Sequence, residues 1–207
     1  MSPKHKQYTR PDLKIIYELV QPGSSVLDLG CGSGELLKKL MDSKNVQGHG
    51  VEIIDDFVLE CVAKGVPVVH SDLDEGLDDF PDHCFDYVIL SQTIQQVRHP
   101  DTTLKEMLRV GKIGIVGLLN FGYWRVRHYL AFQGEMPKSK VLPYEWYNTP
   151  NIHLSTINDF QRLVADLGYD IIKQVNVSNR KRGQLLPNLL PNSFAELAVF
   201  VIKARGN

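Results

Sequence analysis

The chain has 207 residues, a formal net charge of -1, 43% hydrophobic residues and 23% charged residues. That length suits one well-buried domain better than two, and the near-zero net charge disfavours nucleic acid or an anionic membrane as a partner. The three cysteines, Cys31, Cys61 and Cys84, include no closely spaced pair, which argues against a disulfide framework or a CxxC zinc site and favours a reducing compartment.

The first ten residues, MSPKHKQYTR, lack the apolar stretch of a secretory signal. No run in the chain approaches the roughly 18 apolar residues that a membrane-spanning helix needs. We therefore expect a cytoplasmic protein with one domain over residues 1–207 and no membrane partner.

Strand-like and helix-like stretches alternate along the first 120 residues. Apolar residues at helical spacing predict helices at 11–20, 34–41, 55–65 and 103–110. Short apolar runs predict strands at 24–29, 47–54, 66–71, 85–91 and 113–120. These runs are nearly continuous rather than alternating, as expected for a parallel sheet that is covered on both faces.

A helix and two strands are expected near the end of the chain. Thr156 and Asp159 resemble a capping box, with Asp in place of the usual Glu or Gln, and a helical stripe follows as far as Gly168. Residues 169–177 and 194–204 are strand candidates. The whole pattern predicts an α/β fold with a doubly wound, mostly parallel sheet that has room for an antiparallel edge strand.

Residues 120–155 interrupt the alternation and hold both tryptophans and four of the eight tyrosines. A long connection without a regular period, placed after the carboxyl end of a strand, is more often a functional lid than an idle loop. We interpret the segment as a lid or partner surface; the alternative is a structural cap that buries its aromatic residues against the sheet. The aromatic candidates for a substrate pocket, or for the segment's own core, are Tyr123, Trp124, Trp146 and Tyr147.

The stretch VLDLGCGSGE, residues 26–35, runs from an apolar strand through three alternate glycines into a helix. Gly30, Gly32 and Gly34 let the backbone turn tightly and approach a ligand at the positive end of that helix. This spacing alone does not identify the ligand. Where a dinucleotide fingerprint has its third glycine this chain has Glu35, which we expect to crowd the helix against the strand, so a dinucleotide is disfavoured.

Two acids stand at the carboxyl ends of the next two predicted strands. Glu52 comes about twenty residues after the loop, where a carboxylate can accept from both ribose hydroxyls. Asp72 ends the third strand, where a carboxylate can accept from an adenine amino group. The alternatives are a solvated strand-end acid for Glu52 and a helix or turn cap for Asp72.

In order along the chain, VLDLGCGSGE, GVEI, SDLDEGL and FDYVILSQTIQQV resemble the motifs of class I S-adenosylmethionine-dependent methyltransferases. The resemblance implies a seven-stranded Rossmann-like sheet whose last strand is antiparallel. It also implies S-adenosyl-L-methionine or S-adenosyl-L-homocysteine as the cofactor, with its methionyl end over Gly30–Gly34 near Asp28. The ribose would lie on Glu52, and the adenine by Asp72 and the Leu73 backbone. No metal is implied, and no cluster of metal-ligand residues is seen in the sequence.

A closer resemblance covers nearly the whole chain. RPDLKIIYELVQPGSSVLDLGCGSGELL, SQTIQQVRHPDTTLKEMLRVGK and WYNTPNIHLSTINDF resemble the MetW family of methionine biosynthesis proteins. That resemblance implies a cytoplasmic role in methionine biosynthesis alongside a homoserine O-acyltransferase, acetyl or succinyl, as partner.

The turn after the fourth strand, QTIQQVRHPD, holds candidates for a base or a substrate contact. Many methyltransferases of this type carry a His pair near the position of Gln95 and Gln96, but glutamine does not take a proton at neutral pH, which weakens a deprotonating mechanism. We interpret His99 as a surface residue and His153 as either a functional or a structural histidine. Cys31 is interpreted as a small packing residue, and no catalytic residue is assigned.

Two functions remain open at this stage. The first is a binding and regulatory role, in which the protein senses the cofactor and acts on the acyltransferase through the 120–155 segment or one sheet face. The second is methylation of a small molecule enclosed by that segment. The basic cluster NRKRGQ, residues 179–184, is interpreted as a solvated turn, with docking of an acidic partner or a phosphate as the alternative.

Overall fold

The structure is a computed structural model that describes residues 10–139, 141–178 and 185–206. The basic cluster at 179–184 lies outside the described residues. The helices are α1 Pro11–Leu19, α2 Glu35–Lys44, α3 Asp55–Ala63, α4 Pro100–Val110, α5 Trp124–Gln133, α6 Ile157–Asp166, α7 Leu185–Leu189 and α8 Pro191–Phe194, with a short 3-10 turn, η1, at Leu73–Glu75. Within the described ranges none of these helices is long and apolar enough to cross a bilayer.

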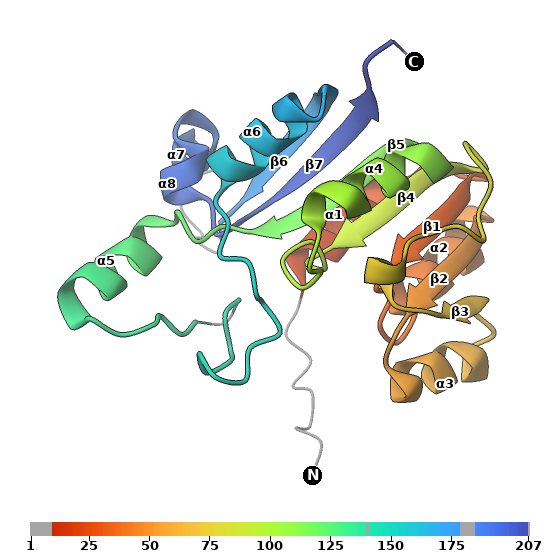
Figure 1. Ribbon diagram of the computed structural model, residues 1–207, viewed down its shortest axis with the longest axis horizontal. Coiled ribbons are helices and arrows are strands. Elements are labelled where there is room, and N and C mark those ends of the chain that lie inside the picture. The colour runs from red at the N-terminus through yellow and green to blue at the C-terminus, as the bar shows by residue number, and fades with distance from the viewer. Residues whose placement is uncertain (1–9, 140, 179–184, 207) are drawn as a thin grey trace.

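Seven strands form one sheet in the order β3-β2-β1-β4-β5-β7-β6 (Figure 1). They are β1 Ser25–Leu29, β2 Gln47–Glu52, β3 Val68–His70, β4 Phe85–Ser91, β5 Gly111–Leu119, β6 Tyr169–Val177 and β7 Leu197–Ala204. Strands β1 to β5 pair in parallel, whereas β7 is antiparallel to both β5 and β6. The predicted sheet, mostly parallel with its last strand antiparallel, is confirmed.

Helices cover both faces of the sheet because each buries one apolar stripe. On one face, α4 and α6 pack Leu104, Met107 and Phe160 into a core cluster, and these helices lie in front of the sheet in Figure 1. On the other face, α1 and α2 contribute Ile16 and Leu37 to a second cluster. The central strands are therefore buried on both sides, which explains their nearly continuous apolar sequences.

The strand order reverses between β1 and β4, which lie side by side in the centre of the sheet. Asp28, near the end of β1, is in register with Gly50 of β2 and Ile89 of β4. The carboxyl ends of these three strands meet at the edge where open α/β sheets bind ligands. The glycine loop follows β1 at that edge.

The local structure differs from expectation chiefly within the 120–155 segment. That segment contains α5, a ten-residue helix with no buried residue, where a connection without a regular period is expected. Because its apolar residues form no single stripe, periodicity does not reveal it. The predicted capping box is confirmed: the Thr156 side chain accepts from the Asp159 N–H, and the Asp159 side chain accepts from the Thr156 N–H.

Candidate ligand site at the glycine loop

The glycine loop between β1 and α2 is closely packed at two glycines and open at the third. All three have φ in the left-handed region, at +72° for Gly30, +54° for Gly32 and +72° for Gly34. A Cβ at Gly30 would lie 2.6 Å from Thr93 Oγ1, and one at Gly34 would lie 2.8 Å from Cys61 Sγ. A Cβ at Gly32 would meet no atom within 4 Å. The backbone at Gly32 is thus the part of the loop that a ligand can approach.

Glu52, at the end of β2, holds this loop in place. The residue is only 6% exposed, and its carboxylate accepts from the Gly32 N–H at 2.7 Å. The other oxygen accepts from the N–H groups of Ile53 at 2.9 Å and Ile54 at 3.0 Å. Since a carboxylate has about four acceptor positions, one remains for a ligand hydroxyl. The alternative of a solvated acid is wrong, and the ribose contact stays a prediction.

Asp28 is a buried carboxylate to which none of the described residues donates a hydrogen bond. Burial raises the pKa of Asp28 to about 7; the Arg10 guanidinium opposes this, and the carboxylates of Glu52 and Asp12 add to it. A cationic group placed beside Asp28 would relieve the cost of burying its charge, which a neutral group would not do. The position is therefore suited to a positively charged part of a ligand.

Another buried acid, Asp12, reaches the site from the first turn of α1. Its Oδ2 accepts from Arg10 Nη2 at 2.7 Å, from Ser91 Oγ at 2.7 Å and from Gln92 Nε2 at 3.1 Å. Its Oδ1 is buried and has no hydrogen-bond partner in the described part of the chain. The sequence analysis does not single out Asp12, because an acid in a first helical turn is equally typical of a surface residue that interacts with the helix dipole. Gln92, with φ of +61°, adds a backbone conformation that is uncommon outside glycine.

Asp72 caps the turn that follows β3. Its Oδ1 accepts from the Asp74 N–H at 2.9 Å at the start of η1, so the turn-cap interpretation is confirmed. This bond uses one carboxylate oxygen, and contact of the other with an adenine amino group stays a prediction. Leu73 packs against the core cluster, which fixes the position of the backbone beside Asp72.

Cys31 serves as a packing residue within the loop. Its sulfur lies 3.8 Å from Cys61 Sγ, and a Cβ at Gly50 would meet it at 2.5 Å. Burial raises the pKa of the Cys31 thiol far above its usual range, so the thiolate needed for nucleophilic attack does not form at neutral pH. These contacts support the steric interpretation.

Glu35 does not crowd the helix against the strand. The residue is exposed at the first position of α2, and the close approach is made one residue earlier, at the buried Gly34. The expectation of a clash at Glu35 is therefore wrong. The reason is that Gly34, and not the residue after it, is the position of this loop that packs against its neighbours Cys61 and Val66.

Gln95 is a buried structural residue rather than an open substrate contact. Its side-chain oxygen accepts from the Leu119 N–H at 3.0 Å, and its Nε2 donates to Leu119 O at 3.0 Å and to Ser155 Oγ at 3.2 Å. Its main-chain oxygen accepts from the N–H groups of Ile152 and His153. Gln95 thereby joins the end of β5 to the end of the 120–155 segment.

The remaining polar candidates lie at the surface near Gln95. Gln96 is exposed, and its Nε2 donates to Gln92 O at 2.9 Å. His99 is exposed at the N-cap of α4, in agreement with a surface residue. His153 is partly buried, with Nε2 3.4 Å from Arg98 O, and its functional or structural role stays open.

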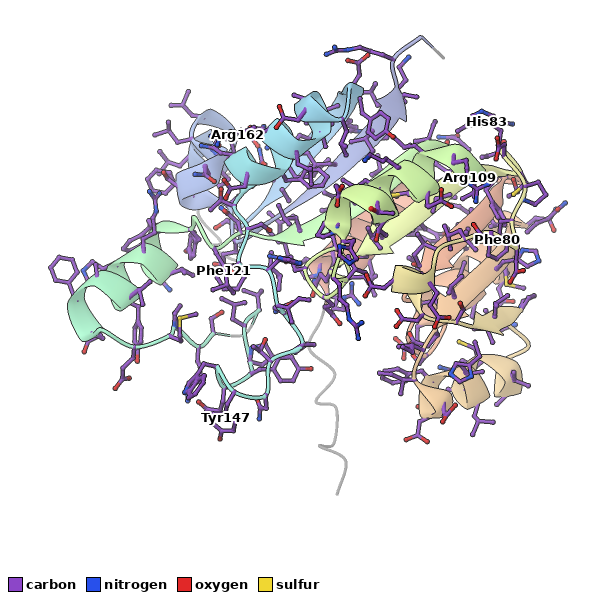
Figure 2. All side chains as sticks on the ribbon, viewed as in Figure 1. Phe80, His83, Arg109, Phe121, Tyr147 and Arg162 are labelled. Atoms are coloured by element: carbon purple, nitrogen blue, oxygen red, sulfur yellow. The ribbon has the colours of Figure 1, made fainter. Side chains whose placement is uncertain are left out.

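The two ends of the 120–155 segment are anchored to each other and to the sheet. The Phe121 N–H donates to Ser155 O at 3.1 Å. The Asn120 side chain donates to Ala195 O at 2.8 Å and accepts from the Gly122 N–H at 2.9 Å. Figure 2 shows Phe121 at the base of the segment, next to the sheet. With its ends held together, the segment is a compact surface loop.

The outer part of this segment, residues 124–139 and 141–150, is mainly exposed, although Leu142 is buried in the second core cluster and Val126 and Val141 pack against it. Trp146 is 73% exposed and Tyr147 is 69% exposed, and Figure 2 shows Tyr147 at the lower edge of the segment, away from the sheet. Tyr123, at the base, is buried. The structural-cap alternative is therefore wrong for Trp146 and Tyr147 and holds for Tyr123 alone among these three.

Two hollows lie away from the glycine loop. The larger, about 390 Å³, lies at the amino-terminal ends of β1, β4 and β5, between Gln21, Tyr87 and Lys112. The smaller, about 40 Å³, lies inside the 120–155 segment, between Met136 and Trp146. Ligands of open α/β sheets bind at the carboxyl ends of the strands, so the glycine loop and not the larger hollow is the candidate site.

The chain matches the family described as Methionine biosynthesis protein MetW over residues 10–202. The chain belongs to the MetW family. A relative in that family is the bifunctional methionine biosynthesis protein MetXA/MetW of Rhodopirellula baltica, which is 36% identical over 197 residues. The match covers 91% of this chain and 32% of the relative.

More distant similarity reaches beyond the MetW family. A ubiquinone/menaquinone biosynthesis C-methyltransferase UbiE of Ectopseudomonas mendocina is 33% identical over 105 residues, which cover 46% of this chain and 40% of that protein. The chain thus spans less than half the length of either relative.

Solved structures share the fold of this MetW-family chain. An S-adenosylmethionine-dependent methyltransferase of Mesorhizobium loti has a TM-score of 0.69 at 15% identity, covering 93% of this chain and 96% of that one. A possible histamine N-methyltransferase of Thermotoga maritima has a TM-score of 0.66 at 20% identity, covering 94% and 87%. The chain therefore has the methyltransferase fold.

The residues at the loop fit an adenosylmethionine-type ligand on chemical grounds. Such a ligand carries an ammonium group, ribose hydroxyl donors and an apolar adenine ring. The buried Asp28 carboxylate receives no hydrogen bond from the described residues and can bind the ammonium group. Glu52 has one acceptor position left for a ribose hydroxyl. Ile53, beside Glu52, is 53% exposed and offers an apolar surface at the end of the GVEI motif. The open space at Gly32 lies within the same loop.

Proposed function

We propose that this MetW-family protein binds S-adenosyl-L-methionine or S-adenosyl-L-homocysteine at the glycine loop and regulates a homoserine O-acyltransferase in the cytoplasm. The proposed ligand binding rests on the buried Asp28 carboxylate, to which none of the described residues donates a hydrogen bond. In this proposal Asp28 binds the ligand's ammonium group, Glu52 its ribose and Ile53 its adenine face, with Asp72 at the adenine amino group. Bound S-adenosylmethionine would supply a methyl group and a positive charge.

The fused relative supports the partner part of the proposal. Its name joins MetXA to MetW in one chain, and the matched part accounts for 32% of its length. Proteins that work together are kept at high effective concentration by such a linkage. Methionine is the precursor of S-adenosylmethionine, so a protein that senses this ligand would report the output of the pathway to an earlier enzyme.

Gln95 supports a sensing role over a deprotonating enzyme. Glutamine does not accept a proton at neutral pH, and here both ends of its amide are already bonded to Leu119. A further bond, from Gln95 Nε2 to Ser155 Oγ, links the turn after β4 with the 120–155 segment, and the same turn packs on the glycine loop through Thr93. A ligand that orders the loop would thereby act on the segment through a continuous set of contacts.

A second function, methylation of a small molecule, is favoured by the similarity to UbiE C-methyltransferases. The two functions share the ligand and differ in its fate. A methylating enzyme consumes S-adenosylmethionine and releases S-adenosylhomocysteine, whereas a sensor leaves it unchanged. Mass spectrometry of S-adenosylmethionine after incubation with the protein, the acyltransferase and a cell metabolite extract separates the two.

The ligand test is calorimetric titration of the purified protein with each of the two compounds. We expect binding to the wild-type protein and at least about tenfold weaker binding to Gly32→Ala, because the added methyl group occupies the open side of the loop. Gly23→Ala is the matched control. Gly23 has a similar φ of +75°, and a Cβ there would also meet no atom within 4 Å. It lies before β1, at the edge of the sheet opposite the glycine loop. Absence of wild-type binding up to millimolar ligand, or equal binding by Gly32→Ala, would overturn this placement.

The partner test is the acyltransferase rate with and without this protein, in the presence of each ligand in turn. We expect the protein to change the rate and the bound ligand to change the size of that effect. An acyltransferase rate that is independent of this protein under all three conditions would refute the regulatory role.

A further inference from the structure

The α5 helix leaves several large apolar side chains exposed to solvent. None of its ten residues is buried, and Phe132 is 75% exposed, with Leu130 at 48%. Figure 1 shows the helix projecting away from the sheet at one side of the molecule. A helix of this length is marginal in water unless one face is packed. Val126 packs against the second core cluster, and the exposed apolar side chains on the rest of α5 are available for an additional contact.

The contacts within α5 are too few to replace such packing. Trp124 and His128 have ring centroids 6.5 Å apart, and His128 and Phe132 have centroids 4.5 Å apart, which forms a ladder along the helix. The connection to the body includes a hydrogen bond from Arg127 to Ser193 Oγ at 2.8 Å. Side-chain pairs at this spacing stabilise a helix only slightly.

The composition of the outer part, residues 124–139 and 141–150, is that of a protein interface. Its exposed large side chains are Tyr129, Leu130, Phe132, Met136, Tyr144, Trp146 and Tyr147. Aromatic residues, Met and Arg are enriched at interface cores and supply most of the binding energy there. Two exposed arginines, Arg125 and Arg127, lie on the same helix, which carries no acidic residue. The surface therefore fits an apolar patch with acidic residues at its rim.

A small apolar hollow in this part adds a place for one partner side chain. It measures about 40 Å³ and lies between Met136, Leu142, Tyr144 and Trp146. This volume is far below the several hundred Å³ that a small-molecule site occupies. It suits a single anchoring side chain from another protein instead.

We infer that residues 124–139 and 141–150 form the surface on which the homoserine O-acyltransferase docks. The inference rests on the proposed function, since the fused relative argues for that occupant over a second copy of this chain. The anchored ends of the segment connect the surface through Gln95 to the turn that packs on the glycine loop. Docking and ligand binding would then share one set of contacts.

The test is co-expression of the full chain with the acyltransferase from the same genome, followed by sizing chromatography and calorimetry of the pair. The variant is Phe132→Ser with Trp146→Ser, at two positions that are mainly exposed. The matched control is Leu59→Ser with Val62→Ser on α3, where the exposed fractions are 67% and 63%. We expect wild type and control to co-elute with the acyltransferase and the variant to bind at least about tenfold more weakly.

Each other result overturns the inference in a different way. If wild type binds and the variant binds equally well, the surface is wrong while the proposed partner stands. If wild type itself does not bind, the partner part of the proposed function fails and the surface loses its occupant. If wild type alone sediments as a dimer that the variant dissolves, the occupant is a second copy. If the variant instead loses affinity for S-adenosylmethionine, the segment is a lid over the ligand.

Discussion

The glycine loop and the outer part of the 120–155 segment differ in what they bury. At the loop, polar groups are taken out of water: Glu52 accepts from three backbone N–H groups, and Asp28 is buried without a described donor. In the outer segment, apolar groups are left in water, with Phe132 and Trp146 mainly exposed. Each arrangement is costly for the isolated chain, because buried charge and exposed apolar surface both raise its free energy.

The two costs indicate two different partners. A buried carboxylate is stabilised by a small cationic group that approaches at the glycine loop. An exposed aromatic helix is stabilised by contact with another protein surface. Substitutions at the loop should therefore change the stability of the isolated chain strongly. Substitutions in the outer segment should leave that stability almost unchanged.

The largest loss of stability is expected for Gly30→Ala. The new residue would hold φ of +72°, at a cost of about 1–2 kcal/mol, and its Cβ would lie 2.6 Å from Thr93 Oγ1, which adds about 1–3 kcal/mol. We expect the free energy of unfolding, measured in urea, to fall by about 4 kcal/mol. Gly134→Ala, at the end of α5, is the control from the other region: its φ is +67° and no atom lies within 4 Å, so only the backbone cost should remain. Equal losses in the two variants would contradict the packing at Gly30.

Glu52→Ala comes next, with an expected loss of about 3 kcal/mol in the free energy of unfolding. The change removes the acceptor of the Gly32, Ile53 and Ile54 N–H groups and leaves a cavity beside the loop. Ligand affinity should fall as well, because the loop is no longer held. Glu145→Ala in the outer segment, where the partner is the exposed Lys138, should change stability by less than about 1 kcal/mol. A stable Glu52→Ala protein would show that the three hydrogen bonds contribute little.

A smaller effect, dependent on pH, is expected for Asp28→Asn. Burial raises the pKa of Asp28 from its ordinary value of 3.8 to about 7. The positive charge of Arg10 lowers this pKa, and the negative charges of Glu52 and Asp12 raise it further. The folded protein therefore holds this proton more tightly than the unfolded chain, and the resulting stability is lost as the pH rises toward 7. Asn cannot ionise, so the variant should gain about 2–3 kcal/mol relative to wild type between pH 5 and pH 8. A difference independent of pH would refute the raised pKa.

The same group should make ligand binding depend on pH. If the ionised Asp28 carboxylate binds the ammonium group, wild-type affinity for S-adenosylmethionine should rise about tenfold from pH 6 to pH 8. The Asn variant should bind weakly with little change across this range. Calorimetry at the two pH values checks both statements, and a parallel rise in the two proteins would exclude Asp28 as the cause.

The smallest effect on stability is expected in the outer segment. Phe132→Ser should change the free energy of unfolding by less than about 0.5 kcal/mol, because the side chain is exposed and its main ring contact is to His128. Urea unfolding of the isolated chain is again the measurement. A loss above about 2 kcal/mol would mean that Phe132 is packed in the isolated protein and that the contrast between the two regions is false.

The amino-acid sequence by itself determined the features that depend on neighbouring residues. Apolar runs placed the five parallel strands, the three alternate glycines marked the loop after β1, and the Thr156–Asp159 pair marked the start of α6. These features are local because backbone conformation at a glycine, the period of a helix or strand, and a capping bond all involve residues a few positions apart.

Only the tertiary structure decided which polar and aromatic side chains are buried. Asp12 is covered because Ser91, 79 positions later, lies against it, and Gln95 is occupied because Ser155, 60 positions later, returns to β5. Trp146, in contrast, has no segment of the described chain covering it and is exposed. Burial depends on which distant segment packs on a side chain, and that information lies in the assembled sheet rather than in any stretch of sequence.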